Sequence, residues 1–139
     1  MSSPFSIERR VEFGDTDMAG IMHFASFFIY MESAEHELYR SLGLSLHEEV
    51  DGELISFPRV AAACDYSSPA RCEEILGIAV SVTRIGAKSI SYEFRFTREE
   101  TLLAIGKITC VCCRVMHGQP PVSRPIPDKI AEGLRAYAM

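Results

Sequence analysis

The sequence contains one long segment of helical periodicity, residues 24–42, and this segment limits the folds open to the rest of the chain. Its apolar residues recur at steps of three and four, which places them on one side of a helix. The stripe consists of Phe24, Phe27, Phe28, Met31, Ala34, Leu38 and Leu42. Gly43 follows as a C-terminal stop. Because the stripe is wide and rich in phenylalanine, we expect the rest of the chain to wrap around this helix.

Strand patterns occupy most of the remaining chain. Residues 5–13 alternate between apolar and polar, and only Arg9 breaks the apolar row. Four further strands are expected at residues 54–66, 75–84, 88–97 and 101–116, with a closing helix at residues 128–138. Pro58 places the start of the first of these four at an edge or bend. Short connections between successive strands favour antiparallel pairing. The sequence therefore predicts an α+β fold in which an antiparallel sheet curls around one long helix.

Length and composition fit a single domain that spans residues 1–139. The net charge of −5 and the pI near 5.4 argue against a general nucleic-acid binder. No apolar run approaches the roughly 20 residues that span a bilayer, and the first ten residues lack an apolar core of signal-peptide type. Five cysteines, an odd number without regular spacing, indicate reduced thiols. We therefore expect a cytoplasmic protein that binds neither membranes nor nucleic acid.

The run Cys110-Val-Cys-Cys113 is the one pattern that suggests a metal site. In a strand, Cys110 and Cys112 share one face while Cys113 faces the other, so the three thiols do not converge on one tetrahedral ion. Buried cysteine is also a common small core residue. A cysteine nucleophile would need a histidine partner, and only His117 is near in sequence. Phosphate-binding glycine loops and the G-x-S-x-G pattern are absent from the sequence. We expect no metal and no cofactor.

Chemistry is indicated most clearly by the loop that precedes the long helix. Asp15 and Asp17 lie one residue apart, so their side chains are expected to point in different directions, one bracing the loop and one facing a ligand. The chain then runs through Gly20 directly into the helix, whose first free N–H groups bind anions or a polarised carbonyl oxygen. A carboxylate beside such a helix end suits acyl transfer from a thioester. His23 is a further candidate base, although a lone histidine is more often structural.

Two carboxylates lie on or beside the apolar stripe of the long helix. Glu35 projects into the middle of the stripe and Glu32 lies at its border. A buried carboxylate is costly unless it is paired or hydrogen-bonded. One of the two could therefore reach a polar site, or both could meet a partner at a subunit contact or a helix end.

Three motifs resemble the 4-hydroxybenzoyl-CoA thioesterase family of hot-dog proteins. The first is Phe13-Gly-Asp-Thr-Asp-Met-Ala-Gly-Ile-Met-His-Phe24, followed by Phe-Phe-x-Tyr-Met-Glu32. The second is Tyr66-Ser-Ser-Pro-Ala-Arg71 with the acidic pair Glu73-Glu74, and the third is Ile85-Gly-Ala-Lys-Ser89. The resemblance covers roughly residues 5–116. It implies a hot-dog fold, dimers whose sheets join, often paired into tetramers, and active sites between subunits.

The resemblance also assigns roles to individual residues. Asp17 aligns with the catalytic carboxylate of the family, which acts as nucleophile or general base, and the backbone N–H of Phe24 would polarise the thioester carbonyl. His23 matches only loosely a position that carries an aromatic residue or histidine in the family. Glu32 matches an acidic position common in the family. Basic residues at strand turns hold the CoA phosphates in the family, and the candidates here are Arg71, Arg84 and Lys88.

Together these expectations describe an enzyme that hydrolyses an acyl-CoA to the free acid and CoA as a homodimer or homotetramer. The alternative is a non-catalytic module of the same fold that binds acyl-CoA or an acyl-carrier protein. Asp17 favours the enzyme, because a mere binder has no use for a carboxylate beside an electron-rich acyl group. A dehydratase or hydratase would pair a histidine with an acid in a different loop pattern. The sequence does not select among aromatic, short and longer acyl groups.

Overall fold

The main sheet is built from five antiparallel strands in a computed structural model that describes residues 4–139. Residues 1–3 of the expected single domain lie outside the described residues. The strands are arranged in the order β1 (Phe5–Arg10), β5 (Ile75–Ile85), β6 (Ser89–Arg98), β7 (Thr101–Val111) and β4 (Arg59–Tyr66). Their alternating residues send apolar side chains such as Ile78, Phe94 and Ile108 to one face, where they are buried. The edge strands β1 and β4 flank the three consecutive strands β5, β6 and β7.

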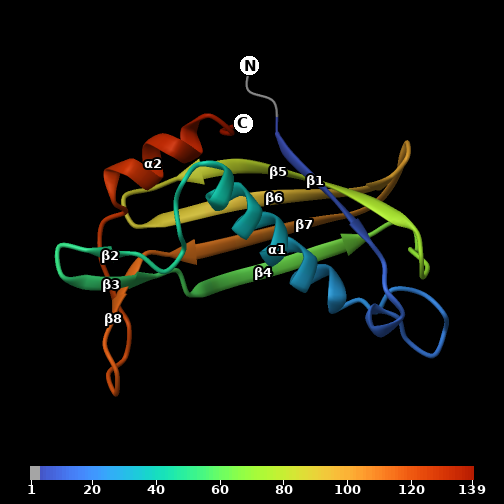
Figure 1. Cartoon of the computed structure of the whole chain (residues 1–139), viewed down its shortest axis with the longest axis horizontal. Coiled ribbons are helices and arrows are strands. Elements are labelled where there is room, and N and C mark those ends of the chain that lie inside the picture. The colour runs from blue at the N-terminus through green and yellow to red at the C-terminus, as the bar shows by residue number, and fades with distance from the viewer. Residues whose placement is uncertain (1–3) are drawn as a thin grey trace.

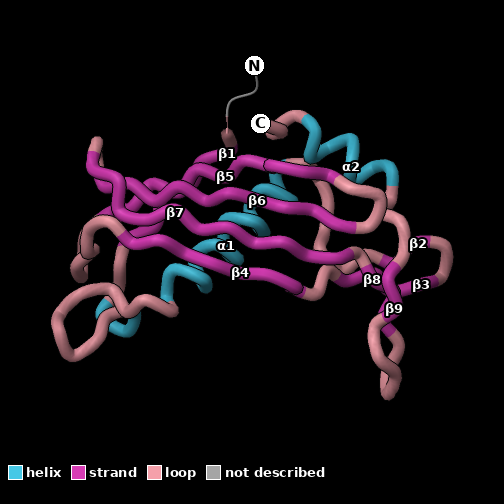
Figure 2. The backbone as a smooth tube through the Cα atoms, turned by 180° about the vertical axis from the view of Figure 1, so that it is seen from behind, coloured by secondary structure: helices cyan, strands magenta, loops and turns pink. Residues whose placement is uncertain are grey.

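Helix α1 (Ser26–Ser41) packs against one face of this sheet and runs obliquely across its strands (Figure 1; Figure 2 gives the view from behind). Its buried residues are Phe27, Tyr30, Met31, Ala34, Glu35, Leu38 and Tyr39. The expected α+β arrangement of a sheet around one long helix is therefore confirmed. The helix begins two residues later than the periodicity indicates, because Phe24 and Ala25 form a turn. Phe24 is consequently 62% exposed, so its place in the predicted buried stripe was wrong.

Two of the predicted strands are each divided between two sheets. Residues 54–66 contain β3 (Glu53–Ser56) and β4, which are separated at Phe57 and Pro58, and residues 101–116 contain β7 and β8 (Cys113–Val115), which are separated at Cys112. At Pro58 the chain leaves the main sheet, because proline lacks the N–H that a continuous ladder needs. The strands β2 (Glu49–Val50), β3, β8 and β9 (Val122–Ser123) form a second, four-stranded sheet at one end of the molecule.

The first predicted strand is shorter than residues 5–13. Strand β1 ends at Arg10, and the 3-10 turn η1 (Phe13–Asp15) leaves Phe13 84% exposed, so Phe13 was wrongly included in the buried row. Arg9, which interrupts that row, stacks its guanidinium over the Tyr30 ring at 3.9 Å and donates a hydrogen bond to Ser33 Oγ at 2.9 Å. The inward-facing cation is thus accommodated by an aromatic face and a hydroxyl.

The buried carboxylate of Glu35 is paired with Arg59 of the edge strand β4. The carboxylate is 1% exposed and accepts two hydrogen bonds from the guanidinium of Arg59 at the start of β4, one of them from Nη1 at 3.1 Å. Arg59 also lies 3.8 Å from a carboxylate oxygen of Glu32. This pairing satisfies a charge that the apolar stripe alone would leave isolated. It also joins the edge strand β4 to the middle of α1.

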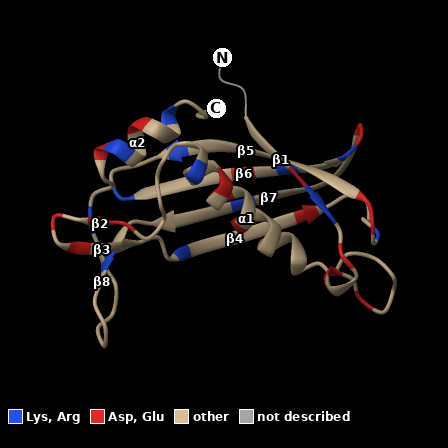
Figure 3. Ribbon diagram, in the orientation of Figure 1, with Lys and Arg blue, Asp and Glu red and all other residues tan. Residues whose placement is uncertain are grey.

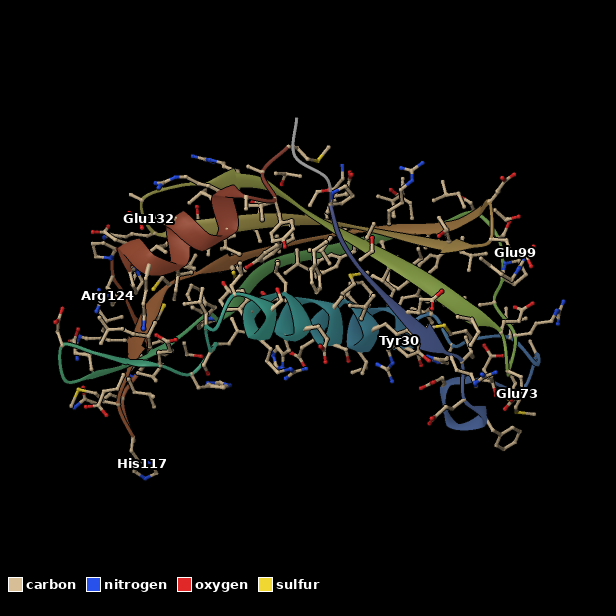
Figure 4. The ribbon with its side chains drawn as sticks, turned by 45° about the horizontal axis from the view of Figure 1, so that its top comes forward. Tyr30, Glu73, Glu99, His117, Arg124 and Glu132 are labelled. Atoms are coloured by element: carbon tan, nitrogen blue, oxygen red, sulfur yellow. The ribbon has the colours of Figure 1, made fainter. Side chains whose placement is uncertain are left out.

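The final helix α2 (Asp128–Arg135) packs beside β5, whose Val82 forms a bridge with Ala138 just after the helix, and it buries Ile130, Ala131 and Leu134. No helix within residues 4–139 is long and apolar enough to cross a membrane. The described cysteines are all free thiols. Burial raises the pKa of Cys110 to about 12 and that of Cys112 to about 11, so both are neutral core residues at physiological pH. His117 is exposed at the tip of the β8–β9 hairpin (Figure 4).

A glycine allows α1 to approach the sheet closely. A Cβ atom on Gly106 of β7 would overlap the terminal methyl group and sulfur of Met31, which is fully buried on α1. We expect Gly106→Ala to lower the free energy of unfolding by about 2 kcal/mol, because overpacking forces the helix or Met31 to move. Gly14→Ala is the matched control, since a Cβ there meets no atom within 4 Å. Urea denaturation measures both, and an equal effect of the two substitutions would contradict the close approach.

Candidate active site

Backbone hydrogen bonds join the two sides of the loop between β1 and α1. The N–H of His23 donates to the carbonyl of Asp15 at 2.8 Å, and the N–H of Asp17 donates to the carbonyl of Ile21 at 2.9 Å. The N–H of Met22 donates to the carbonyl of Ala70 at 2.7 Å, in the loop that joins β4 to β5. Residues distant in sequence are thereby held at one end of the sheet, beside the start of α1.

Asp15 braces this loop through both its side chain and its backbone. Its Oδ2 accepts a hydrogen bond from the Tyr30 hydroxyl at 2.5 Å and one from the N–H of Glu12 at 3.1 Å. Its carbonyl also accepts from Ser26 Oγ at 3.1 Å. Figure 4 shows Tyr30 on α1 beside β1. Burial, and then the Asp15 carboxylate, raise the pKa of Tyr30, so its hydroxyl remains a donor. The bracing role expected for one of the two acids therefore belongs to Asp15.

Asp17 faces a pocket instead. Its Oδ1 accepts a hydrogen bond from the N–H of Ala19 at 2.9 Å, while its Oδ2 accepts none from residues 4–139. The pocket has a volume of about 410 Å³ and draws its walls from three segments of the chain. It is lined by Asp17, Ile21, Met22, Phe24, Phe27, Tyr66, Ser67, Ser68 and Pro69. Most of these walls are apolar, so the pocket suits an organic group with one polar reacting centre.

Phe24 supplies a backbone donor at the same pocket. Its N–H has no hydrogen-bond acceptor among the described residues, and Ala25, which precedes the first helical residue, offers no side-chain cap. A free N–H at the start of a helix attracts negative charge, and the helix dipole adds to that attraction. The structure thus places Asp17 and Phe24, the two residues that the sequence predicted, among the residues that line one pocket.

Tyr66 is one of several pocket-lining residues to which the sequence assigned no role. Its hydroxyl donates to the carbonyl of Phe24 at 2.9 Å, and its ring meets Phe27 edge to face with centroids 5.1 Å apart. Phe27 in turn packs on Phe96 at 5.0 Å. The motif that begins at Tyr66 was visible in the sequence, but a contact across 42 residues was not.

His23 is not among the pocket-lining residues. Its side chain is exposed, its Nδ1 accepts a hydrogen bond from the N–H of Ala25 at 3.2 Å, and its ring lies on that of Phe24 with centroids 4.7 Å apart. These contacts describe a side chain that caps the turn before α1.

The three predicted phosphate-binding residues do not meet within one chain. Arg71 lies in the loop after β4, close to the pocket-lining Pro69. Arg84 and Lys88 flank the β5–β6 turn, where Ile85 pairs with Ile90. The pocket lies at the opposite end of the sheet, where Phe96 and Tyr66 both pair with Ala104. In the ribbon of Figure 3, basic residues lie at both ends of the sheet and acidic residues lie around the loop before α1.

An antiparallel sheet packed against one long helix is also the fold of thioesterases whose crystal structures superpose on this chain. The model of the thioesterase-like superfamily matches residues 11–134, and the chain belongs to that superfamily. Membership confirms the predicted fold and the predicted thioesterase class. The narrower 4-hydroxybenzoyl-CoA thioesterase family is not singled out by these matches.

Several relatives resemble the chain over nearly its whole length. A 1,4-dihydroxy-2-naphthoyl-CoA hydrolase from Synechococcus elongatus is 25% identical, with 96% of this chain and 97% of the relative covered. The acyl-CoA thioester hydrolase YbgC of Escherichia coli O6:H1 is 28% identical over 87% of this chain and 88% of the relative. The crystal structure of a 1,4-dihydroxy-2-naphthoyl-CoA thioesterase from Synechocystis superposes with a TM-score of 0.83 at 26% identity, covering 94% of this chain and 95% of that one.

Proposed function

We propose that this protein hydrolyses an acyl-CoA thioester to the free acid and CoA in the cytoplasm, with Asp17 as nucleophile or general base. The observation that carries the proposal is the presence of an unpaired Asp17 carboxylate oxygen and an unpaired Phe24 amide at one apolar pocket. The relatives named above are CoA-thioester hydrolases, which supports the same reaction.

The two groups divide the chemistry between them. The acyl group enters the apolar pocket, and the thioester carbonyl oxygen accepts a hydrogen bond from the N–H of Phe24. The Asp17 carboxylate then attacks the carbonyl carbon, or takes a proton from a water molecule that does so. Negative charge that develops on the oxygen is stabilised by the amide and by the positive end of α1. The carbon–sulfur bond breaks, and CoA leaves as its thiol once the sulfur takes up a proton. With water as the attacking group the free acid forms directly; with Asp17 as nucleophile, a water molecule then hydrolyses the mixed anhydride, which releases the free acid and restores the carboxylate.

We also propose that two chains pair through their β4 edges. Strand β4 pairs with β7 alone, and its residues from Val60 to Ala63 are apolar and exposed. An exposed apolar edge strand is a template for a further strand. An antiparallel two-fold pairing sets the Arg59 end of one β4 beside the Tyr66 end of the other. The end of the partner's sheet that carries its β5–β6 turn then approaches the pocket.

This pairing gives the CoA phosphates a second source of positive charge, in addition to that of the chain that supplies the pocket. Arg71 would approach them from the chain that supplies the pocket, and the partner subunit's Arg84 and the partner subunit's Lys88 would approach from the other side. In this scheme the active site lies between subunits, as in the family that the sequence resembles. Two such dimers could associate further into a tetramer.

The first test of the function is a panel of aromatic, short-chain and long-chain acyl-CoA esters, followed by the release of free thiol. We expect at least one ester to be cleaved with kcat/KM of about 10⁴ M⁻¹s⁻¹ or more, the lower end of the range usual for enzymes. Tight binding of an acyl-CoA without release of thiol would favour the non-catalytic binding module instead. Release from acyl-carrier-protein esters alone would move the substrate from CoA to the carrier protein.

The edge pairing makes a prediction about Ala62, which is exposed near the middle of β4. Ala62→Lys is expected to weaken the dimer at least tenfold, because the two-fold axis sets the two lysines close to each other and like charges across strands repel. Ala136→Lys adds the same charge after α2, at an exposed position away from β4, and should leave the dimer intact. Sedimentation velocity over a range of protein concentrations measures both. An Ala62→Lys variant that is as dimeric as the wild type would contradict pairing through β4.

A further inference from the structure

The peptide that carries the Phe24 amide is held from both sides. On its N-terminal side, the N–H groups of Met22 and His23 donate to the carbonyls of Ala70 and Asp15. On its C-terminal side, the carbonyl of Phe24 accepts the hydrogen bond from the Tyr66 hydroxyl. The Phe24 amide lies between these anchors and is the first donor of the run without an acceptor among residues 4–139. The carbonyl of the same peptide group, that of His23, accepts a hydrogen bond from the N–H of Ser26 at 2.9 Å. The direction of the Phe24 N–H therefore depends on this bond and on the two anchors.

The anchor at Tyr66 is fixed by the sheet and not by the loop. Tyr66 ends β4 and is paired with Ala104 of β7. Its ring packs edge to face on Phe27, which is buried against Phe96. These contacts restrict the ring, so the hydroxyl has a defined position relative to the first turn of α1. At the N-terminus of α1, Ala25 has no capping side chain, and its N–H donates to His23 Nδ1 at 3.2 Å, so the Phe24–Ala25 peptide group is held at its N–H by His23 and at its carbonyl by Tyr66.

We propose that Tyr66 is a positioning residue of the oxyanion site, which acts by holding the Phe24 carbonyl so that the Phe24 N–H points toward the thioester carbonyl. This inference rests on the proposed function. Burial is the main cause that raises the pKa of Tyr66 to about 12, so the hydroxyl stays protonated and donating throughout the pH range of an ordinary assay. The hydroxyl itself need not touch the substrate.

The expected effect follows from the role of the amide. Complete loss of one oxyanion donor lowers kcat by about 10²–10³-fold in other enzymes. Loosening a donor that remains present should cost less, and we expect Tyr66→Phe to lower kcat about tenfold. Since the interaction strengthens as charge develops on the oxygen, KM should stay within about twofold of the wild-type value. The phenyl ring keeps the packing on Phe27, so the variant should fold as the wild type does.

The test measures kcat and KM of the wild type, Tyr66→Phe and Tyr137→Phe with the best substrate of the acyl-CoA panel. Tyr137 packs against Phe5 near the C-terminus and does not line the pocket, so removal of its hydroxyl should leave both constants unchanged. Inhibition by free CoA and the thermal midpoint serve as measures of binding and folding. In Tyr66→Phe we expect the inhibition constant of free CoA to stay within about twofold of the wild-type value. The thermal midpoint should stay within about 2 °C.

The outcomes separate this inference from the function on which it rests. A wild type that cleaves no thioester would overturn the proposed function and this inference with it. An active wild type with an equally active Tyr66→Phe variant would overturn the inference alone. A raised KM with an unchanged kcat would do so too, because the hydroxyl would then bind the substrate directly. A fall in kcat alone, with CoA inhibition and thermal stability preserved, is the result that supports it.

Discussion

Asp17→Asn is expected to lower kcat/KM for the best acyl-CoA substrate about a thousandfold. The amide has nearly the shape of the carboxylate, and its oxygen can still accept the hydrogen bond from the N–H of Ala19. What it loses is the capacity to attack the carbonyl or to take a proton from water. Most of the loss should therefore appear in kcat, while KM should change little. Thiol release under steady-state conditions measures both constants.

A matched substitution separates catalysis from charge. Asp128→Asn removes one carboxylate at the start of α2, at an exposed position outside the pocket, and should leave kcat/KM within about twofold of the wild type. An Asp17→Asn variant with more than about a third of wild-type kcat would show that Asp17 is neither the nucleophile nor the general base. The reaction would then need another base.

The second large effect is expected at the buried ion pair. Arg59→Leu should lower the free energy of unfolding by about 3–5 kcal/mol, because it leaves the carboxylate of Glu35 buried without a partner. For a domain of this size the thermal midpoint should fall by about 10 °C or more. The hydroxyls of Tyr39 and Tyr92, 3.0 Å apart, are buried nearby and stay neutral, because burial raises the pKa of both. A neutral hydroxyl does not replace the positive charge of Arg59.

Two controls identify the cause of that loss. The double variant Glu35→Leu with Arg59→Leu should recover most of the stability, since replacing a buried pair by apolar groups is often close to neutral. Arg40→Leu breaks the exposed pair with Glu37 and should cost less than about 1 kcal/mol. Thermal and urea denaturation at one protein concentration compare all three. If Arg59→Leu cost no more than Arg40→Leu, the buried pair would not stabilise the contact between β4 and α1.

The order of the elements could be predicted because each has its own period in the sequence. The wide apolar stripe of α1 and the alternation of β6 depend only on neighbouring residues. Pro58 predicted a bend in the first of the two divided strands, but neither Pro58 nor Cys112 showed that the two halves pair in different sheets, since both halves keep a strand pattern and only their partners differ. The start of α1 was misplaced at Phe24 because a phenylalanine in phase with the stripe does not reveal the turn that exposes it.

The site was predictable to the extent that it is local. Asp17 and Phe24 belong to one short loop before a helix, and the chemistry of a helix end follows from sequence position alone. Tyr66 joins them across 42 residues, and Arg59 meets Glu35 across 24, so neither partner is visible without the fold. The separation of Arg71 from Lys88 likewise follows only from the sheet register.

The most direct test of the central claim is a crystal structure of the Asp17→Asn variant with its best acyl-CoA substrate bound intact. The acyl group should occupy the pocket between Phe27 and Tyr66, with the thioester carbonyl oxygen about 2.7–3.1 Å from the backbone nitrogen of Phe24. The side chain at position 17 should face the carbonyl carbon. An acyl-CoA bound elsewhere, or one whose carbonyl points away from the Phe24 amide, would contradict the proposed site.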